Sequence, residues 1–269
     1  MSPLPLPPVP EPYRVPFHYG ALHMVGLDFL VDPGPVRALL GKHHPALAAA
    51  EFEGSAVVSV NYQLYFAQYP GGGGITQEIE VNLLAHPVGA ADRLPELTYR
   101  QYAHGWERTG LTGIARIHVL CDNPLAIDAG RRLYAEPKYP GSFESLMPSP
   151  NGPDDGRTWR VDCRDGSGPL LSFEVDLTDR PSTVVNHTPI TGYGTTAEGR
   201  ALAGPMAVHH PGTWYDLEGT GTRLALHAPG SPVGQDLAAL LGDTPATAAW
   251  AYQSPPVAAH QRPYYLPTR

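Results

Sequence analysis

The sequence predicts an α+β fold in which antiparallel strands dominate. Three observations lead to this prediction. Several short stretches alternate apolar and polar residues or run through β-branched and aromatic residues, turn-forming residues separate them, and only three segments have a helical pattern. Sheet therefore makes up most of the expected structure.

From His23 onward the chain has the pattern of short strands broken by turns, for example at residues 56–66, 77–85, 113–121, 158–163, 170–177 and 222–226. The helical patterns lie at residues 35–40, 124–135 and 234–241. The second helix has the clearest start, because Asn123 can cap it and Pro124 suits a first position that needs no intrahelical donor. Pro137 then ends it, which leaves Lys138 at a stiff junction.

The chain length of 269 residues allows one large or two small domains. Because no linker divides the interior, we expect a single domain over residues 17–269. Residues 1–16 contain seven prolines and should form an extended, polyproline-like arm. Such an arm could be a recognition ligand, although a segment lying along a subunit neighbour is the favoured interpretation.

Composition and charge exclude several classes of function. The hydrophobic content of 42% is ordinary, no stretch approaches the roughly 20 apolar residues of a membrane span, and the N-terminus lacks the pattern of a secretory signal. We therefore expect a cytoplasmic protein. The net charge of −8, without a basic block, argues against nucleic acid and anionic membranes as partners and favours small molecules.

The two cysteines and the histidine pairs do not predict a metal site. Cys121 and Cys163 lack zinc-ligand spacing and are expected to be reduced and structural. The two His-His pairs, at 43–44 and 209–210, are adjacent in sequence rather than at ligand spacing. The glycine run at 71–74 predicts a hairpin loop rather than a phosphate site. We expect neither a metal nor a cofactor.

The most informative residue is Lys138, one of only two lysines among the eighteen basic residues. It lies in the run CDNPLAIDAGRRLYAEPKYPGSFE. A primary amine can condense with a ketone to give an iminium, so an unusual lysine is a candidate for covalent carbonyl chemistry. Two alternatives stay open: a GC-rich genome favours arginine over lysine, and a Pro-Lys pair can be a solvated surface corner.

This run resembles the acetoacetate decarboxylase superfamily, in which a strand ends in an LDN-like turn, a helix carries Gly-Arg, and Pro-Lys supplies the reacting amine. The corresponding residues are Leu120, Asp122, Asn123, Gly130, Arg131, Pro137 and Lys138. The resemblance covers about residues 17–252 and is most specific around Lys138. It implies a sheet curled into a cone or barrel, a substrate cavity in its interior, no cofactor, and a homo-oligomer.

Two departures from the family pattern affect the expected reaction. Tyr139 stands where the decarboxylases carry a second lysine, and Gly20 or Leu22 stands where they carry an arginine thought to receive the substrate carboxylate. The resemblance therefore implies a cofactor-independent lyase that binds a keto acid or related ketone on Lys138, with aldolase, dehydratase or cyclase chemistry in specialised metabolism favoured. The alternatives are β-keto acid decarboxylation and a non-catalytic or non-covalent small-molecule binding barrel.

An iminium-forming lysine must be neutral when it attacks, whereas a free ammonium has a pKa of about 10.4. We expect burial beside Tyr134, Tyr139 and Phe143, aided by Arg131 or Arg132, to depress the pKa of Lys138.

The resemblance also implies an acidic residue on a strand before the lysine motif. Glu78 and Glu80 are the candidates, and their spacing of two places both on one face of a strand, where either could move protons. A solvated pair of carboxylates on an exposed strand face is the alternative.

Five further residues are candidates for binding substrate. Arg116 and Arg131 could bind a carboxylate through the guanidinium group, although Arg131 could instead be structural. Arg116 is expected to share a strand face with His118. The other candidates are Tyr134, Tyr139 and Tyr252, of which Tyr252 is more typical of a core residue.

Overall fold

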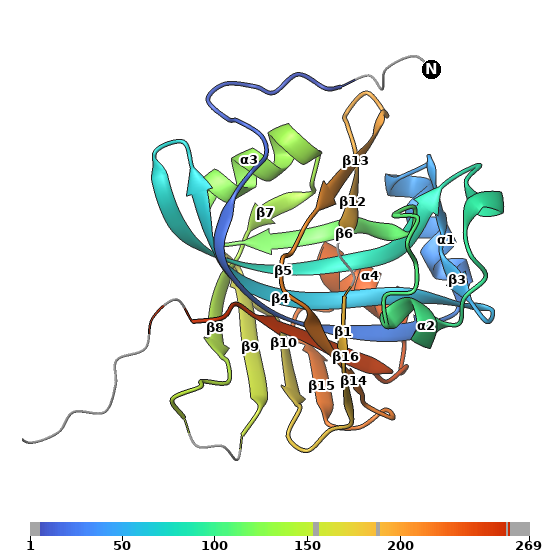
Figure 1. Cartoon of the computed structure of the whole chain (residues 1–269), viewed down its shortest axis with the longest axis vertical. Helices are drawn as coiled ribbons and strands as arrows, with labels where there is room; N and C mark the ends of the chain where they lie inside the picture. Colours follow the sequence, from blue (N-terminus) through green and yellow to red (C-terminus); the bar gives the residue numbers. More distant parts are fainter. Residues whose placement is uncertain (1–5, 153–155, 187–188, 257, 259–269) are drawn as a thin grey trace, which may run out of the picture.

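The structure is a computed structural model that describes residues 6–152, 156–186, 189–256 and 258. Within these residues the chain forms a sheet of 12 strands and a second sheet of four. In Figure 1 the strands of the smaller sheet run across the direction of the long strands of the larger one.

Nine strands form the path of the larger sheet in the order β11-β14-β16-β1-β4-β5-β6-β12-β13. Their bounds are β11 (Ser182–Val185), β14 (Gly212–Asp216), β16 (Ala248–Gln253), β1 (Tyr19–Val31), β4 (Ser55–Tyr69), β5 (Gly72–Pro87), β6 (Gly113–Cys121), β12 (Ile190–Thr195) and β13 (Ala201–Met206). Three short strands pair beside this path: β2 (Leu47–Ala49) on β5, β3 (Glu51–Phe52) on β4 and β7 (Lys138–Pro140) on β6. The smaller sheet has the order β15 (Thr222–Leu226), β10 (Gly168–Asp176), β9 (Thr158–Asp165) and β8 (Ser142–Leu146).

The helices are few and short. They are α1 (Pro33–His43), the 3-10 turn η1 (Ala91–Arg93), α2 (Tyr99–Ala103), α3 (Pro124–Tyr134) and α4 (Pro232–Leu241). Among the strand pairs of the described residues, those of β6 with β12 and with β7 are the parallel ones. The predicted α+β class, mainly antiparallel, is therefore confirmed. The larger sheet is curled but not closed, because β11 and β13 end its path without pairing to each other.

The larger sheet has one apolar face and one polar face. The apolar face carries Val25, Leu27, Val58, Val60, Ile79 and Val81, which pack with the smaller sheet, α1 and α4 in the main core. The opposite face, called the polar face below, carries Asp28, Ser59, Asn61, Gln63, Glu78, Glu80 and Asn82, all buried. Register places these side chains in rows across the strands, such as Asp28 beside Ser59 and Ser59 beside Asn82. Burying so many polar groups requires partners, and this face holds the candidate site.

Most predicted elements lie where their patterns indicate. The strands over 113–121 and 222–226 have the predicted bounds, and the predicted strands over 56–66 and 77–85 are the centres of the longer β4 and β5. Part of the glycine run at 71–74 belongs to β5 rather than to the turn. No predicted range corresponds to α2, to the short strands β2, β3, β7 and β8, or to β11, β12, β13, β14 and β16.

The N-terminal segment packs on α3 of the same chain. The Tyr13 hydroxyl donates to Asp128 Oδ2 at 2.5 Å, and Arg132 donates to the Glu11 carbonyl at 2.7 Å. The Arg132 guanidinium also lies 5.4 Å from the centroid of the Tyr13 ring. Residues 1–5 of the predicted arm, and residues 257 and 259–269 of the predicted domain, lie outside the described residues.

In the described part of the chain, no helix combines the length and the apolar composition that crossing a membrane requires.

Candidate functional site

The turn between β6 and α3 is anchored to the neighbouring strand β5. Asp122 accepts a hydrogen bond from the Gln77 backbone amide at 2.8 Å, and Asn123 donates to Thr76 Oγ1 at 3.0 Å. Asn123 also caps α3 by accepting from the Leu125 amide. Asp122 and Asn123 therefore fix the start of α3 over the end of the polar face.

The end of α3 turns the chain back so that Lys138 lies beside β6. Ala135 has a φ of 54°, in the left-handed region, and the chain then runs into β7 parallel to β6, with Lys138 opposite Val119. The Nε atom of Arg131 donates to the Lys138 carbonyl at 2.7 Å, which holds the backbone of the lysine. Gly130 leaves room for its side chain, because a Cβ there would lie 2.6 Å from Lys138 Cδ.

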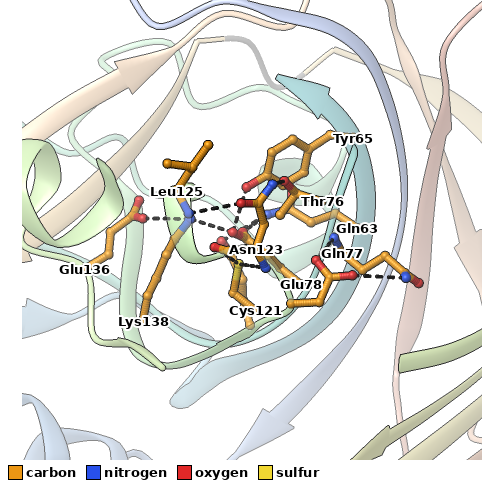
Figure 2. A network of polar contacts seen from close by, with 12 residues as sticks. Gln63, Tyr65, Thr76, Gln77, Glu78, Cys121, Asn123, Leu125, Glu136 and Lys138 are labelled. Carbon is orange, nitrogen blue, oxygen red and sulfur yellow. Dashed lines mark hydrogen bonds and ion pairs between the residues drawn. The ribbon is translucent and has the colours of Figure 1, made fainter. Parts of the chain in front are cut away.

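The Lys138 ammonium lies between two carboxylates. Its Nζ is 2.6 Å from Glu78 Oε1 and 3.2 Å from Glu136 Oε2. Figure 2 shows the lysine side chain directed towards both glutamates. Glu78 comes from β5, whereas Glu136 precedes the lysine by two residues. Lys138 is 7% exposed and Glu78 1% exposed, so the pair is shielded from solvent.

Arg116 extends this arrangement into a cluster of five charges. Its Nε lies 2.7 Å from Glu80 Oε1, and a second guanidinium nitrogen lies 3.3 Å from Glu136 Oε1. Glu136 therefore bridges the lysine and the arginine. The ion cluster, defined as Glu78, Glu80, Arg116, Glu136 and Lys138, has three carboxylates and two cations, so one negative charge is in excess.

Neutral side chains of the polar face satisfy the remaining carboxylate oxygens. Gln63 donates to Glu78 Oε2 at 2.8 Å, and the Tyr65 hydroxyl donates to Glu78 Oε1 at 2.7 Å. Asn82 donates to Glu80 Oε2 at 3.1 Å. Charged groups this deeply buried are stable only when paired and hydrogen-bonded, and each of these glutamates has both kinds of partner.

The pKa of Lys138 is shifted in the direction opposite to the one that the sequence predicts. Burial does lower this pKa, but the adjacent Glu136 and Glu78 carboxylates outweigh burial and raise it well above its usual value. The expectation of a depressed pKa is therefore wrong. Burial likewise acts to raise the pKa of Glu136, but Lys138 and Arg116 hold it below its usual value. Lys138 is an ammonium in this state.

A small cavity of about 20 Å³ adjoins Lys138, which is room for about one water molecule. Its walls are largely aromatic and come from β1, β4, α3 and the segment before β1. The lining residues are Phe17, Tyr19, Tyr65, Tyr69, Ala126, Ala129, Gly130, Tyr134, Glu136 and Lys138. A ketone can reach Nζ only if some of these rings move.

A β-bulge separates Arg116 from His118, which the sequence analysis expected on one face. The β5–β6 register shifts between Val81 and Asn82, so that Ile117 is an extra residue. Arg116 consequently points to Glu80, whereas His118 Nε2 lies 2.8 Å from Asp236 Oδ2 of α4. The prediction that both share a face is wrong for this reason.

The predicted tyrosines lie in three different places. Tyr134 lines the Lys138 cavity. The Tyr139 hydroxyl lies 3.1 Å from His118 Nδ1, on the side of β7 away from the ion cluster. Tyr252 lies on β16, where its ring centroid is 5.6 Å from that of His210, and it does not line the cavity.

The other predicted residues differ in whether they contact the Lys138 side chain. Glu78 contacts Lys138 directly, and Glu80 contacts Arg116 instead. Arg131 is exposed on α3 and reaches the site only through its bond to the Lys138 carbonyl.

Glu136 is the member of the ion cluster that sequence reasoning missed. The signal was available, because residues two apart in an extended segment share a face, and Glu136 precedes Lys138 by two. The same spacing drew attention to Glu78 and Glu80.

Among the residues that the structure describes, no group of three or more His, Cys, Asp or Glu side chains is arranged to hold a metal ion.

Comparison with known proteins shows the fold. Neither models of protein families nor curated protein sequences match this chain. Solved structures do: MppR, an enduracididine biosynthesis enzyme complexed with pyruvate, is 14% identical over 90% of this chain and 88% of its own, with a TM-score of 0.59. An acetoacetate decarboxylase-like enzyme from Sphingomonas wittichii RW1 is 14% identical over 87% of this chain and 86% of its own, with a TM-score of 0.53.

Acetoacetate decarboxylase from Legionella pneumophila is 13% identical over 91% of this chain and 87% of its own, with a TM-score of 0.51. The acetoacetate decarboxylase-like fold that the residues around Lys138 predict is thereby confirmed.

Proposed function

We propose that this protein is a cofactor-independent lyase that binds a keto acid or related ketone as an iminium on Lys138. The observation that carries the proposal is the Lys138 amine, buried and in contact with the carboxylates of Glu78 and Glu136. Similarity of fold to acetoacetate decarboxylases and to MppR supports it. A structural lysine would gain nothing from an adjoining cavity, whereas a reacting amine requires one.

The raised pKa of Lys138 is compatible with this chemistry, because the overall step conserves charge. The nitrogen forms a bond to the carbonyl carbon, the carbonyl oxygen leaves as water with two of the ammonium protons, and the iminium keeps one proton and the positive charge. Glu78 and Glu136 therefore stabilise the iminium as they stabilise the ammonium. The two carboxylates disfavour only the neutral form of the Lys138 amine, which exists transiently before the attack.

A carboxylate must accept the proton that the ammonium releases before it attacks. Glu78 Oε1 and Glu136 Oε2 are the acceptors within reach of Nζ, at 2.6 and 3.2 Å. Glu136 is also paired with Arg116, which makes it the weaker base. We infer that Glu78 takes the proton and later returns it, while Glu80 holds Arg116 in place.

Two departures from the decarboxylase pattern favour aldolase, dehydratase or cyclase chemistry over decarboxylation of a β-keto acid: Tyr139 stands in place of a second lysine, and Gly20 or Leu22 in place of an arginine. Among the described residues that line the Lys138 cavity, Lys138 is the sole cation, and Arg116 behind it is paired with two glutamates. A substrate carboxylate next to the reacting carbonyl would meet excess negative charge. This applies to α-keto acids and β-keto acids alike, so the preference between reaction types depends on the departures at Tyr139 and at Gly20 or Leu22. MppR has been solved with the condensation product of pyruvate and imidazole 4-carboxaldehyde, which is consistent with carbon-carbon bond formation in this fold.

Borohydride trapping tests the proposal. The protein is incubated with pyruvate, acetoacetate or acetone, reduced, digested and weighed. We expect one stable adduct on Lys138, and none in Lys138→Ala. Lys42→Ala is the matched control, because Lys42 is the only other lysine. An unchanged mass with all three carbonyl compounds, or an adduct that maps to Lys42, contradicts the proposal and favours non-covalent binding.

The reaction type is tested separately. Release of CO2 from acetoacetate marks a decarboxylase, whereas condensation of pyruvate with an aldehyde marks the favoured chemistry. We expect Glu78→Gln to slow either turnover by roughly a hundred-fold or more, because it removes a general base and leaves a neutral amide of similar shape.

A further inference from the structure

Another cavity lies at the other end of the polar face, where α2 and the loop after it cover β1, β14 and β16. Its volume is about 210 Å³. It lies next to Asp28 on β1, whereas Lys138 is on β7. The residues that line this cavity and those that line the Lys138 cavity have no member in common, so the two cavities are distinct.

Asp28 is the charged group at the base of this cavity. It is 7% exposed, and its carboxylate accepts hydrogen bonds from the Tyr99 hydroxyl at 2.8 Å and from Trp250 Nε1 at 3.1 Å. Gly26 leaves room for the Trp250 ring, because a Cβ on Gly26 would lie 2.2 Å from that ring. The ring can therefore lie directly over β1, where its Nε1 donates to Asp28.

Asp28 differs from the other buried carboxylates because its partners are neutral. Glu78, Glu80 and Glu136 each contact a lysine or arginine, whereas no ion pair of the described residues includes Asp28. Burial accordingly raises its pKa, against the hydrogen bonds from Ser59, Tyr99 and Trp250. A buried carboxylate without a counter-charge is costly, and a cationic ligand would remove that cost.

The walls of the cavity suit the apolar part of such a ligand. Trp214, Trp250 and Tyr102 contribute rings, and Leu84, Ile114 and Ile190 contribute aliphatic side chains. Indole and phenol rings attract a cation that lies over their faces within about 6 Å. A cavity of about 150 Å³ is large enough for benzene, so 210 Å³ holds a six-membered ring with a short ammonium arm.

Two further charges line the cavity. Glu107 is held within its own loop, accepting from the amides of Thr109 and Gly110 at 2.7 and 3.0 Å, and Arg108 is exposed. When Asp28 is ionised, the three groups leave one negative charge in excess, which favours a cation over an anion.

We propose that this cavity binds a small organic ammonium ion, with the ammonium group donating to Asp28 and a compact apolar body lying among Trp214, Trp250, Leu84 and Ile114. The proposal is independent of covalent chemistry at Lys138, because it concerns other residues at another cavity.

Calorimetric titration of the full chain with benzylamine, against benzyl alcohol as the neutral probe of equal size, tests the proposal. We expect benzylamine to bind at least ten-fold more tightly than benzyl alcohol. Asp28→Asn should remove that preference while circular dichroism remains native, and Asp92→Asn, at an exposed acid, should preserve it. Equal affinity for both probes, or benzylamine affinity unchanged in Asp28→Asn, overturns the proposal.

Two more variants keep the test decisive if Asp28→Asn fails to fold. Ile114→Phe fills the cavity from its apolar wall without touching the hydrogen bonds of Asp28, and it should abolish binding of benzylamine. Persistent binding in that variant overturns the proposal. Lys138→Arg should bind benzylamine as the unaltered protein does. Loss of benzylamine binding in Lys138→Arg would mean that benzylamine binds at the ion cluster. The proposal would then fail even if iminium trapping succeeded.

Discussion

Gly130 and Lys138 are packed so closely that any side chain at position 130 would displace the side chain of Lys138 or Glu136. A Cβ on Gly130 would lie 2.6 Å from Lys138 Cδ and 2.7 Å from its Cε, and 2.5 Å from Glu136 Oε2. Gly130 thus leaves room for the side chain of Lys138, and Arg131 holds the Lys138 backbone through its hydrogen bond to the carbonyl.

Gly130→Ala should displace the Lys138 amine. Alanine is the better helix former, but overpacking at this position costs about 1–3 kcal/mol and moves Nζ away from Glu78. We expect a folded protein with a strongly reduced yield of the trapped adduct. Gly41→Ala in α1 is the matched control, since nothing lies within 4 Å of a Cβ there. It should stabilise the protein by up to about 1 kcal/mol, with unchanged trapping. Equal trapping in both variants would contradict this packing argument.

The stability of the protein should fall at alkaline pH in part through Lys138. Its pKa is raised by Glu136 and Glu78 above the usual 10.5, so the folded chain holds this proton more tightly than the unfolded chain. The resulting stabilisation is complete below pH 10.5 and is lost as pH rises through the folded-state pKa.

Urea unfolding between about pH 9 and 12 measures this loss. Lys138→Arg is the comparison, because arginine keeps its charge over the range while the tyrosines titrate equally in both proteins. The free energy of unfolding should decline less steeply with pH in the variant. Parallel declines would show that Lys138 has an ordinary pKa.

Sequence reasoning succeeded where the determinants are contiguous. Residues 120–138 contain a capping asparagine, a proline at the first helical position, a glycine that the lysine packs against, and the lysine itself, and each acts within this stretch or on the adjoining strand β5. Hydrophobic alternation likewise predicts β4, β5 and β6, because one face of each is packed in the core.

The parts that sequence reasoning missed depend on contacts across the chain or on local irregularity. The bulge at Ile117 leaves no sequence signature, yet it places Arg116 and His118 on opposite faces of β6. The bond between Trp250 and Asp28 joins residues 222 positions apart. The strand β13 contains Pro205, which argues against a strand unless it lies at the edge of a sheet, as it does here.

Tyr134 and Tyr139 should behave differently when each loses its hydroxyl group. Tyr134 lines the Lys138 cavity, so Tyr134→Phe should change the ketone concentration that half-saturates trapping by several-fold. Tyr139→Phe loses the contact with His118 Nδ1, which contributes about 1 kcal/mol to stability. Its trapping kinetics should be unaltered. Slower trapping in Tyr139→Phe would instead favour the sequence-based hypothesis that Tyr139 contacts the substrate.

Arg116 should be worth more to stability than an exposed arginine in an ion pair. Its guanidinium is the one cation in contact with Glu80, and it shares Glu136 with Lys138. Arg116→Met leaves a buried carboxylate uncompensated, which costs about 3–5 kcal/mol. Arg37→Met is the matched control, because Arg37 forms a similar pair with Glu51 but its side chain is 59% exposed. That variant should cost no more than about 1 kcal/mol.

The double variant Arg116→Met, Glu80→Gln distinguishes uncompensated charge from lost packing. If the cost of Arg116→Met arises from the isolated Glu80 carboxylate, neutralising Glu80 should recover part of the free energy of unfolding, and the two substitutions will not be additive. If the cost arises from packing of the arginine stem, the two losses will add. Urea unfolding of the four proteins in this cycle measures the coupling. Because Arg116 also contacts Glu136, recovery should be incomplete, and full additivity would mean that the ion cluster does not act as a unit.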